Sequence, residues 1–354
     1  MIRPAKLLLW SASQLYGLAV AARNGLYDLG ILRCHSFALP VICVGNITAG
    51  GTGKTPHVIY LAEKLAAHTR VAVLSRGYLR KSRGFRHVTS ESTTTEAGDE
   101  PLLMAHCLPQ AAVYVDRNRV NGIREIMRAE PRTGAVILDD GFQHRAVKAG
   151  MNILLTDWQR LMTRDRLLPL GMLREQKGAV KRAGIIIVTK VPPGTSPVQT
   201  AGVTGELRAA GFAGAIYFTT LIYGRLKHIF NETEREITPS TSILLVTGIA
   251  SPQPMADYLG TITGNITRIS FPDHHKYTIG DLERITRAYD AMGGNDKLIV
   301  TTAKDAVRLK EITNIAIRVR EALFHLPVSV QFIENEDDFL SKVYSYAGKY
   351  HQDR

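Results

Sequence analysis

The segment with the clearest chemical meaning is glycine-rich and ends in a lysine and a threonine, reading VGNITAGGTGKT from residue 44 to residue 55. It follows the apolar run 41–44 and precedes a stretch, 56–68, that favours a helix. Backbone amides in such a loop turn toward phosphate oxygens, the lysine neutralises the outer phosphates, and the threonine hydroxyl can ligate Mg²⁺. A glycine-rich structural turn is the alternative interpretation. The expected nucleotide contacts are Thr48, Ala49, Gly50, Gly51, Thr52, Gly53, Lys54 and Thr55.

Two adjacent carboxylates follow another apolar run. Asp139 and Asp140 come directly after residues 135–138, which read AVIL. An aspartate at the carboxyl end of a parallel strand lies across from the phosphate loop, where it can hold the metal or a water bound to the metal. A strand-ending aspartate also commonly caps the next turn. Its combination with the phosphate loop favours the metal-binding interpretation.

These residues need a sheet to position them, and short apolar runs alternate with helical stretches along the first half of the chain. This order is typical of a mainly parallel sheet sandwiched by helices. Continuous apolar runs suit strands that are buried on both faces. The sequence therefore predicts an α/β domain of the P-loop NTPase type. Its predicted strands are residues 41–44, 71–74, 112–115, 135–138, 153–156 and 185–189.

A second, smaller α/β domain is expected in the C-terminal part. Residues 217–223 read as a strand that leads away from the first sheet, and residues 243–247 and 297–301 read as core strands. The strand-like residues 327–333 are a candidate partner for the strand near residue 217. Linker strands of this domain are expected to close the active-site cleft. The expected division is an N-terminal helical segment at 1–38, the P-loop domain at 39–215 and the smaller domain at 216–354.

Composition narrows the class of protein. A chain of 354 residues with 45% apolar residues can bury two cores. The net charge of +12 indicates an anionic partner, such as nucleic acid, a phosphorylated metabolite or an acidic membrane surface. No basic and aromatic interleaving of a nucleic-acid module is present, so no nucleic-acid partner is expected. The three scattered cysteines are typical of reduced residues in a cytosolic protein.

The N-terminal segment is rich in leucine but interrupted by polar residues. Residues 1–22 are too short and too polar for a membrane-spanning helix, which needs about 20 apolar residues. Through residue 40, four basic side chains accompany one acid, Asp28, and each cation near an anionic leaflet contributes about 1 kcal/mol. An interfacial, membrane-associated helix is therefore expected. The alternative is a helix packed on the core of the protein.

Three classes of P-loop protein are compatible with the loop alone. A guanine-nucleotide switch needs an aspartate where Pro192 follows Thr189-Lys190-Val191, so guanine specificity is not supported. A partition-type ATPase has a lysine just before the paired glycines, where Ala49 stands. A membrane-recruited ATPase switch of the partition or biotin-synthesis type stays open as the alternative to a small-molecule kinase.

Seven sequence blocks carry a resemblance over most of the chain. They are GNITAGGTGKTP at 45–56, SRGY at 75–78, GDEP at 98–101, DDGFQH at 139–144, LLPLGMLRE at 167–175, DHH at 273–275 and TAKD at 302–305. In these blocks the chain resembles the lipid A 4'-kinases, also called tetraacyldisaccharide 4'-kinases. Leu79 and Gln176 depart from residues common in the family, glycine and proline, without removing a charged group.

The resemblance implies a fold and an activity. It implies ATP and Mg²⁺ as cofactors and two α/β domains with the active site in the cleft between them. The implied reaction phosphorylates the 4'-hydroxyl of a tetraacylated glucosamine disaccharide 1-phosphate in lipid A biosynthesis. The implied location is peripheral, on the cytoplasmic face of the inner membrane, and no protein partner is evident.

Residue roles follow from positions in these motifs. Lys54 is placed on the phosphates and Thr55 on the metal, with Asp139, Asp140 and Glu175 around the ion. Asp99 is implied as the catalytic base, with His274 as a partner that orients or tunes it. Taken alone, Asp99 before Glu100-Pro101 would also suit a helix N-cap, and His274 a structural histidine.

The acceptor is expected to meet arginines. Residues 70–90 contain several basic side chains and no acid, which is common for a solvated face. The competing hypothesis places Arg76 and Arg117 at the lip of the cleft, because the guanidinium fork suits a sugar headgroup or its phosphate. Asn46 is the third residue expected at the acceptor.

Overall fold

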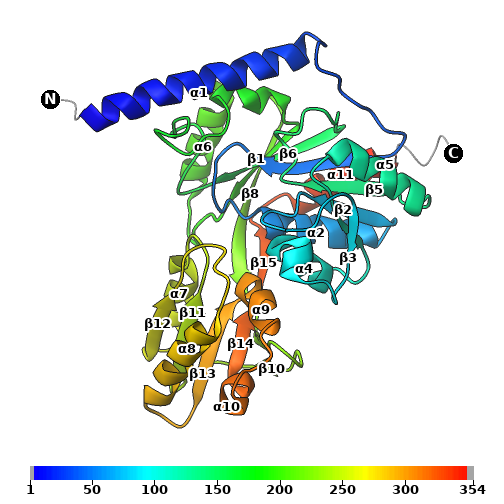
Figure 1. The fold of residues 1–354 in the computed structure, drawn as a ribbon. Helices are drawn as coiled ribbons and strands as arrows, with labels where there is room; N and C mark the ends of the chain where they lie inside the picture. Colours follow the sequence, from blue (N-terminus) through cyan, green and yellow to red (C-terminus); the bar gives the residue numbers. More distant parts are fainter. Residues whose placement is uncertain (1–3, 349–354) are drawn as a thin grey trace.

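Two β-sheets, each covered by helices, organise the chain (Figure 1). The structure, a computed structural model, describes residues 4–348. The first three residues of the expected N-terminal segment and the last six of the expected C-terminal domain therefore lie outside the described residues. Among the described residues, the larger sheet has nine strands and the smaller sheet has six.

The larger sheet is parallel from β4 to β8 and has an antiparallel strand at each edge. Because β1, β2, β5 and β7 are continuous apolar runs, they are buried along their whole length. The six strands predicted from the sequence are confirmed. In spatial order the sheet contains β15 (Val328–Phe332), β8 (Ala215–Tyr223), β7 (Ile185–Thr189), β6 (Met151–Asp157), β1 (Val41–Asn46), β5 (Ala135–Asp139), β2 (Val71–Ser75), β4 (Ala112–Val115) and β3 (Arg86–Val88).

Helices cover both faces of this sheet, as the sequence predicted. In α2, Val58, Leu61 and Leu65 are buried at helical spacing, which points one apolar stripe at the strands. The helices of this face are α2 (Lys54–Ala66), α3 (Thr94–Ala97), α4 (Asp99–Cys107) and α11 (Glu336–Gly348). The opposite face is covered by α5 (Arg119–Ala129), the 3₁₀ helix η1 (Lys177–Arg182) and α6 (Pro197–Ala209).

The smaller sheet forms a second unit with a core on each face. Its strands in spatial order are β10 (Glu234–Arg235), β9 (Leu226–His228), β14 (Leu323–Leu326), β13 (Lys297–Thr302), β11 (Ser242–Thr247) and β12 (Ile266–Ser270). Helix α7 (Gln253–Gly260) packs on one face. The other face is covered by α8 (Ile279–Ala291), α9 (Ala303–Lys310) and α10 (Ile317–Glu321).

The expected boundary between the units needs a correction. The strand expected to lead away from the first sheet, β8, is hydrogen-bonded within it, parallel to β7. The predicted pairing of β15 with β8 is confirmed, and it is antiparallel. Helix α11 also returns to the first core through the buried Phe339 and Val343. The smaller sheet is therefore inserted in the chain between β8 and β15. The buried Tyr217 in β8, together with β15 and α11, completes the core of the larger sheet.

The N-terminal helix α1 (Pro4–Asp28) lies across the end of the molecule opposite the smaller sheet (Figure 1). Its leucines face away from the protein, with Leu8, Leu15 and Leu18 about 70% exposed (73%, 70% and 69%). The side that packs on the protein carries Ser13 and Gly17. The alternative of a helix that buries its leucines in the core is therefore wrong. No helix in residues 4–348 is long and apolar enough to cross a bilayer.

Candidate active site

The phosphate loop connects β1 to α2 as predicted. Gly53 precedes α2 with φ 81°, a left-handed conformation that favours glycine. In the described part of the chain no side chain caps the start of α2. The first amides of a helix have no partner within the helix and carry the positive end of its dipole, so this end suits an anion.

The loop is held by polar contacts from within and from β7. Asn46 Nδ2 donates to Thr52 Oγ1 at 2.7 Å, and Lys54 Nζ donates to Asn46 Oδ1 at 3.3 Å. Thr189 Oγ1 donates to the Thr52 carbonyl at 2.9 Å. Asn46 is fully buried. Asn46, which was expected at the acceptor, directs its side chain into the loop and contacts Thr52 and Lys54. The sequence did not predict this direction.

Two observations show that the loop has free space and, among the described residues, a buried hydroxyl without a hydrogen-bond partner. A Cβ added to Gly50 or Gly51 would meet no atom within 4 Å. The Thr48 hydroxyl is buried and has no hydrogen-bond partner among residues 4–348. Buried polar groups are nearly always paired, so the loop has the space and the polar capacity for phosphate oxygens.

The two aspartates after β5 differ in environment. Asp139 is buried and accepts from Ser75 Oγ at 2.8 Å, and burial together with the charges of Glu100 and Asp140 raises its pKa to about 6. Asp140 lies 3.5 Å from Lys54 and 3.0 Å from Arg174. Burial alone would raise the pKa of Asp140, but Lys54 and Arg174 outweigh it and lower that pKa. Both carboxylates therefore adjoin the loop, and Asp140 is the anion that faces Lys54.

Glu175 lies in a different setting from the one expected. It is buried, and its oxygens accept from Arg182 at 2.6 Å and from Asn24 and Gln143 at 2.9 Å each. Residues 4–348 contain no group of three or more His, Cys, Asp or Glu side chains arranged to hold a metal. The expected four-residue metal set is thus not assembled here. Thr55 and the two aspartates remain near the loop, while Glu175 joins α1 to the body of the protein.

The predicted dyad is brought together from the two units. His274 Nδ1 lies 2.9 Å from Asp99 Oδ2, although the residues are 175 positions apart. Asp99 is the first residue of α4, and Gly98, with φ 88°, is its N-cap, so the N-cap alternative for Asp99 is wrong. Burial would raise the pKa of Asp99, but the His274 hydrogen bond and Arg308 hold it well below its ordinary value. The hydrogen bond to Asp99 raises the pKa of His274.

The arginines near the two aspartates and in the neighbouring segments differ in exposure. Arg76 and Arg117, which were expected at the acceptor, are exposed. Arg119 is buried and donates to the carbonyl oxygens of Asp116 and Asp139, at 2.6 and 3.0 Å. Its burial lowers the pKa of Arg119 to about 10. Sequence reasoning missed Arg119, Arg174 and Arg308, and only the adjacency of Arg174 to Glu175 in its motif hinted at one of them.

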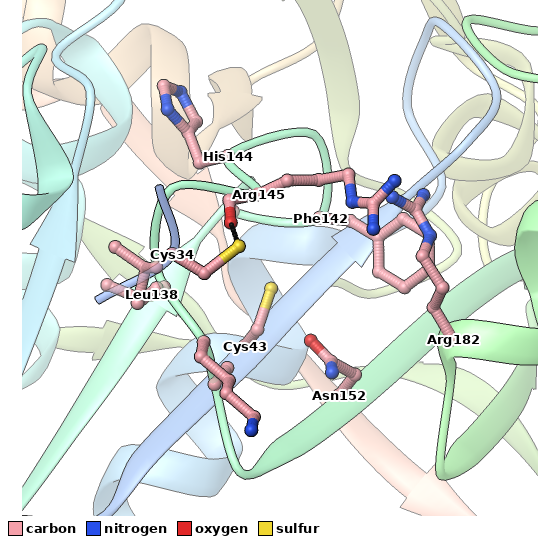
Figure 2. Close-up of a pocket in the computed structure, with 12 residues that line it drawn as sticks. Cys34, Cys43, Leu138, Phe142, His144, Arg145, Asn152 and Arg182 are labelled. Carbon is pink, nitrogen blue, oxygen red and sulfur yellow. Dashed lines mark hydrogen bonds between the residues drawn. The ribbon is translucent and has the colours of Figure 1, made fainter. Parts of the chain in front are cut away.

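A cavity of about 330 Å³ lies beside the site and is lined partly by the DDGFQH block. Figure 2 shows Cys34 and Cys43 on one side and the guanidinium of Arg182 over the Phe142 ring, 4.6 Å from its centroid, on the other. Cys34 Sγ donates to the Arg145 carbonyl at 3.1 Å. Burial raises the pKa of Cys43 to about 12, which leaves an unreactive thiol. The cavity lining contains neither the phosphate loop nor the dyad.

Comparison with known proteins gives consistent matches along the chain. A family model described as Tetraacyldisaccharide-1-P 4'-kinase matches residues 5–346. The tetraacyldisaccharide 4'-kinase of Bacteroides thetaiotaomicron is 42% identical over 342 residues, covering 93% of this chain and 90% of that protein. The protein of the same name from Phocaeicola vulgatus is 40% identical over 348 residues, covering 96% and 95%.

A solved structure matches the fold. LpxK from Aquifex aeolicus in complex with ATP has a TM-score of 0.76 and 30% identity, covering 97% of this chain and 99% of that chain. The resemblance in the seven sequence blocks and the predicted fold class are confirmed by these matches, and the partition-type ATPase alternative is not favoured. The chain belongs to the tetraacyldisaccharide-1-P 4'-kinase family.

Proposed function

We propose that this protein transfers the γ-phosphoryl group of ATP to the 4'-hydroxyl of a tetraacylated glucosamine disaccharide 1-phosphate. The observation that carries the proposal is the 2.9 Å contact between Asp99 and His274, which joins the two units on the loop side of the larger sheet. Phosphoryl transfer needs positioning and charge neutralisation more than covalent chemistry. A phosphate loop, a cation and a group that accepts a proton supply these parts.

The nucleotide would bind with its phosphates at the amides of the loop and with Lys54 on the outer phosphates. Mg²⁺, when bound, neutralises phosphate oxygens as charge develops during transfer. Its ligands would come from Thr55, Asp139 and Asp140, because hydroxyl and carboxylate oxygens are the donors that Mg²⁺ prefers. Asp140 and Asn46 hold Lys54 at the loop, 3.5 and 3.3 Å from its Nζ.

The acceptor hydroxyl attacks the γ-phosphorus, the bond to ADP breaks, and the hydroxyl proton passes to the Asp99–His274 pair. The low pKa of Asp99 and the raised pKa of His274 favour a carboxylate that stays charged and an imidazole that holds the proton. The side chain of His274 is 21% exposed and that of Asp99 is 8% exposed, so the pair reaches the surface mainly through the imidazole.

The lipid part of the acceptor has a matching surface. The exposed leucines of α1 form an apolar face, and beside it a groove of about 500 Å³ is lined by Trp10, Leu167 and Leu170. We assign the acyl chains to this groove and to the bilayer beneath α1. The sugar and its 1-phosphate would contact Arg76 and Arg117. We propose that the protein acts as a peripheral enzyme on the cytoplasmic face of the inner membrane, with the exposed leucines of α1 against the bilayer.

The test is direct. The purified protein is incubated with ATP labelled in the γ-phosphate, Mg²⁺ and a tetraacylated disaccharide 1-phosphate in detergent micelles. Label in the lipid at the 4'-position is the expected result. Release of labelled inorganic phosphate alone, without lipid product, would contradict the proposed transfer.

A further inference from the structure

The TAKD block at residues 302–305 opens α9 of the second unit and is not used by the chemistry described so far. Thr302 caps the helix by accepting from the Asp305 amide at 3.1 Å. Asp305 is fully buried and accepts from the Gly248 amide at 3.0 Å. One turn later, Arg308 Nη1 donates to Asp305 Oδ1 at 2.8 Å. The block therefore fixes the direction of the Arg308 side chain from inside the second unit.

Arg308 reaches across to the first unit. Its Nη2 donates to Asp99 Oδ2, the same oxygen that contacts His274. Arg308 is 6% exposed and Asp99 is 8% exposed, so this ion pair is largely shielded from water. The other oxygen of Asp99, Oδ1, accepts from the amide of Glu100 at 3.0 Å. The carboxylate of the proposed dyad is thus held from both sides.

From this geometry we infer that Arg308 is a positioning residue, which sets the orientation and the charge of the Asp99 carboxylate so that the dyad can receive the acceptor proton. A planar guanidinium anchored to Asp305 and to the Gly248 carbonyl, at 3.0 Å, has little freedom to rotate. It therefore fixes the oxygen that faces His274. The role rests on the proposed phosphoryl transfer and adds a residue from the second unit to it.

A neighbouring pair of similar kind allows a matched comparison. Lys304 of the same helix pairs with Glu100, the residue after Asp99. Both pairs join α9 to α4, but only Arg308 contacts Asp99. If the two cations merely dock the units on each other, their removal should have equal effects.

Charged groups from every side act on Asp99. Helix α9 contributes Lys304 and Arg308, and the loop before α8 contributes His274 with Asp273 beside it. Loss of Arg308 removes a cause that lowers the pKa of Asp99 and leaves burial, which raises it. Because the pair can take up the proton only while the carboxylate is ionised, the loss of activity on acidification should begin at a higher pH in the variant than in the wild type.

The experiment measures kcat, both KM values and the pH profile for the wild type, Arg308→Met, Arg308→Lys and Lys304→Met. A general base contributes about 10²- to 10⁴-fold, so kcat of Arg308→Met should fall about 100-fold with the KM for ATP unchanged. The acid limb of kcat/KM should move to higher pH. Arg308→Lys should recover part of kcat, since it keeps the charge but not the fork. Lys304→Met should lose less and move the acid limb less, because Lys304 acts on Asp99 more weakly than Arg308 does.

A double-mutant cycle makes the inference independent of folding. In an Asp99→Asn background, Arg308→Met should cause little further loss, because the group it positions is already disabled. If Arg308→Met reduces kcat by the same factor in both backgrounds, the positioning role is overturned. Equal losses of kcat and equal shifts of the acid limb for Arg308→Met and Lys304→Met would overturn it as well. Should Arg308→Met fail to bind ATP, Arg308→Lys carries the same cycle. Absence of lipid labelling by the wild type would instead refute the proposed function.

Discussion

Glu175→Gln distinguishes a structural carboxylate from a metal ligand. Glu175 Oε2 accepts from both Arg182 and Asn24, and Oε1 accepts from Gln143. A glutamine at this position has one acceptor oxygen and one NH₂ group. Whichever way the amide is turned, at least one of the surrounding donors then faces another donor. The substitution also removes the charge that pairs with Arg182.

The magnitude follows from these contacts. A buried donor left without its acceptor costs about 1–3 kcal/mol, and hydrogen bonds to a charged group contribute about 1.5–3 kcal/mol. Arg182 is 24% exposed, so water replaces part of the lost interaction. We therefore expect a loss of about 3 kcal/mol in the free energy of unfolding. At about 2–4 °C per kcal/mol for a unit of roughly this size, Tm should fall by roughly 6–12 °C.

The assay combines calorimetry with a Mg²⁺ titration of kinase activity. Glu206→Gln is the matched control, because Glu206 pairs with Arg164 on the surface, where ion pairs contribute about 0–1 kcal/mol. Glu175→Gln should lower Tm clearly more than the control and leave the Mg²⁺ concentration for half-maximal activity unchanged. A large increase in that concentration with a nearly normal Tm would refute the structural reasoning and restore Glu175 as a metal ligand.

Three further predictions follow from exposure and pKa. Arg76→Ala and Arg117→Ala should raise the KM for the lipid acceptor far more than the KM for ATP in steady-state assays, because both side chains are exposed and are the ones proposed to contact the acceptor. Leu8→Gln with Leu15→Gln should reduce sedimentation with anionic vesicles while ATP binding persists, since both leucines are exposed on α1. Burial lowers the pKa of His57 to about 4, so at pH values between 6.5 and 4 this side chain binds a proton when the protein unfolds. Between pH 6.5 and 4 the wild type should lose about 3 kcal/mol of stability through this group, a loss that urea unfolding should find absent in His57→Gln.

The controls for these predictions use residues elsewhere on the surface. Arg83→Ala, in the same basic run, should leave both KM values unchanged, and equal increases for acceptor and ATP in Arg76→Ala would contradict the acceptor role. Val198, 81% exposed on α6, is the control for α1, and Val198→Gln should not alter vesicle binding. The sign for His57 is definite: its folded pKa lies below the unfolded one, so the unfolded state binds more protons and acid destabilises the fold.

Local pattern was enough to predict six strands of the larger sheet and the phosphate loop. An unbroken apolar run followed by glycines and Lys54 predicts a strand, a phosphate-binding loop and a helix, and the structure has these elements in this order. The direction of side chains could not be read in the same way. Asn46 and Glu175 both stand next to groups that bind ligands in such folds, yet both turn into the protein and bond to it.

The strand at residues 217–223 illustrates a second limit. Its sequence shows that a strand is present, but its neighbours in the sheet are β7, a short distance back along the chain, and β15, more than a hundred residues ahead. Pairing over that distance depends on which segment covers an exposed edge. The sequence of the strand itself does not carry this information.

The proposed base is composite, and this has a physical consequence for the proposed transfer. Asp99 begins α4 on the first unit, whereas His274 and Arg308 come from the second unit. The pKa of Asp99 is lowered by His274 and Arg308, and the pKa of His274 is raised by its hydrogen bond to Asp99, so both shifts depend on contacts between the two units. Any substitution that loosens the packing of α9 on α4 should therefore reduce turnover before it reduces nucleotide binding, which depends on a loop held entirely within the first unit.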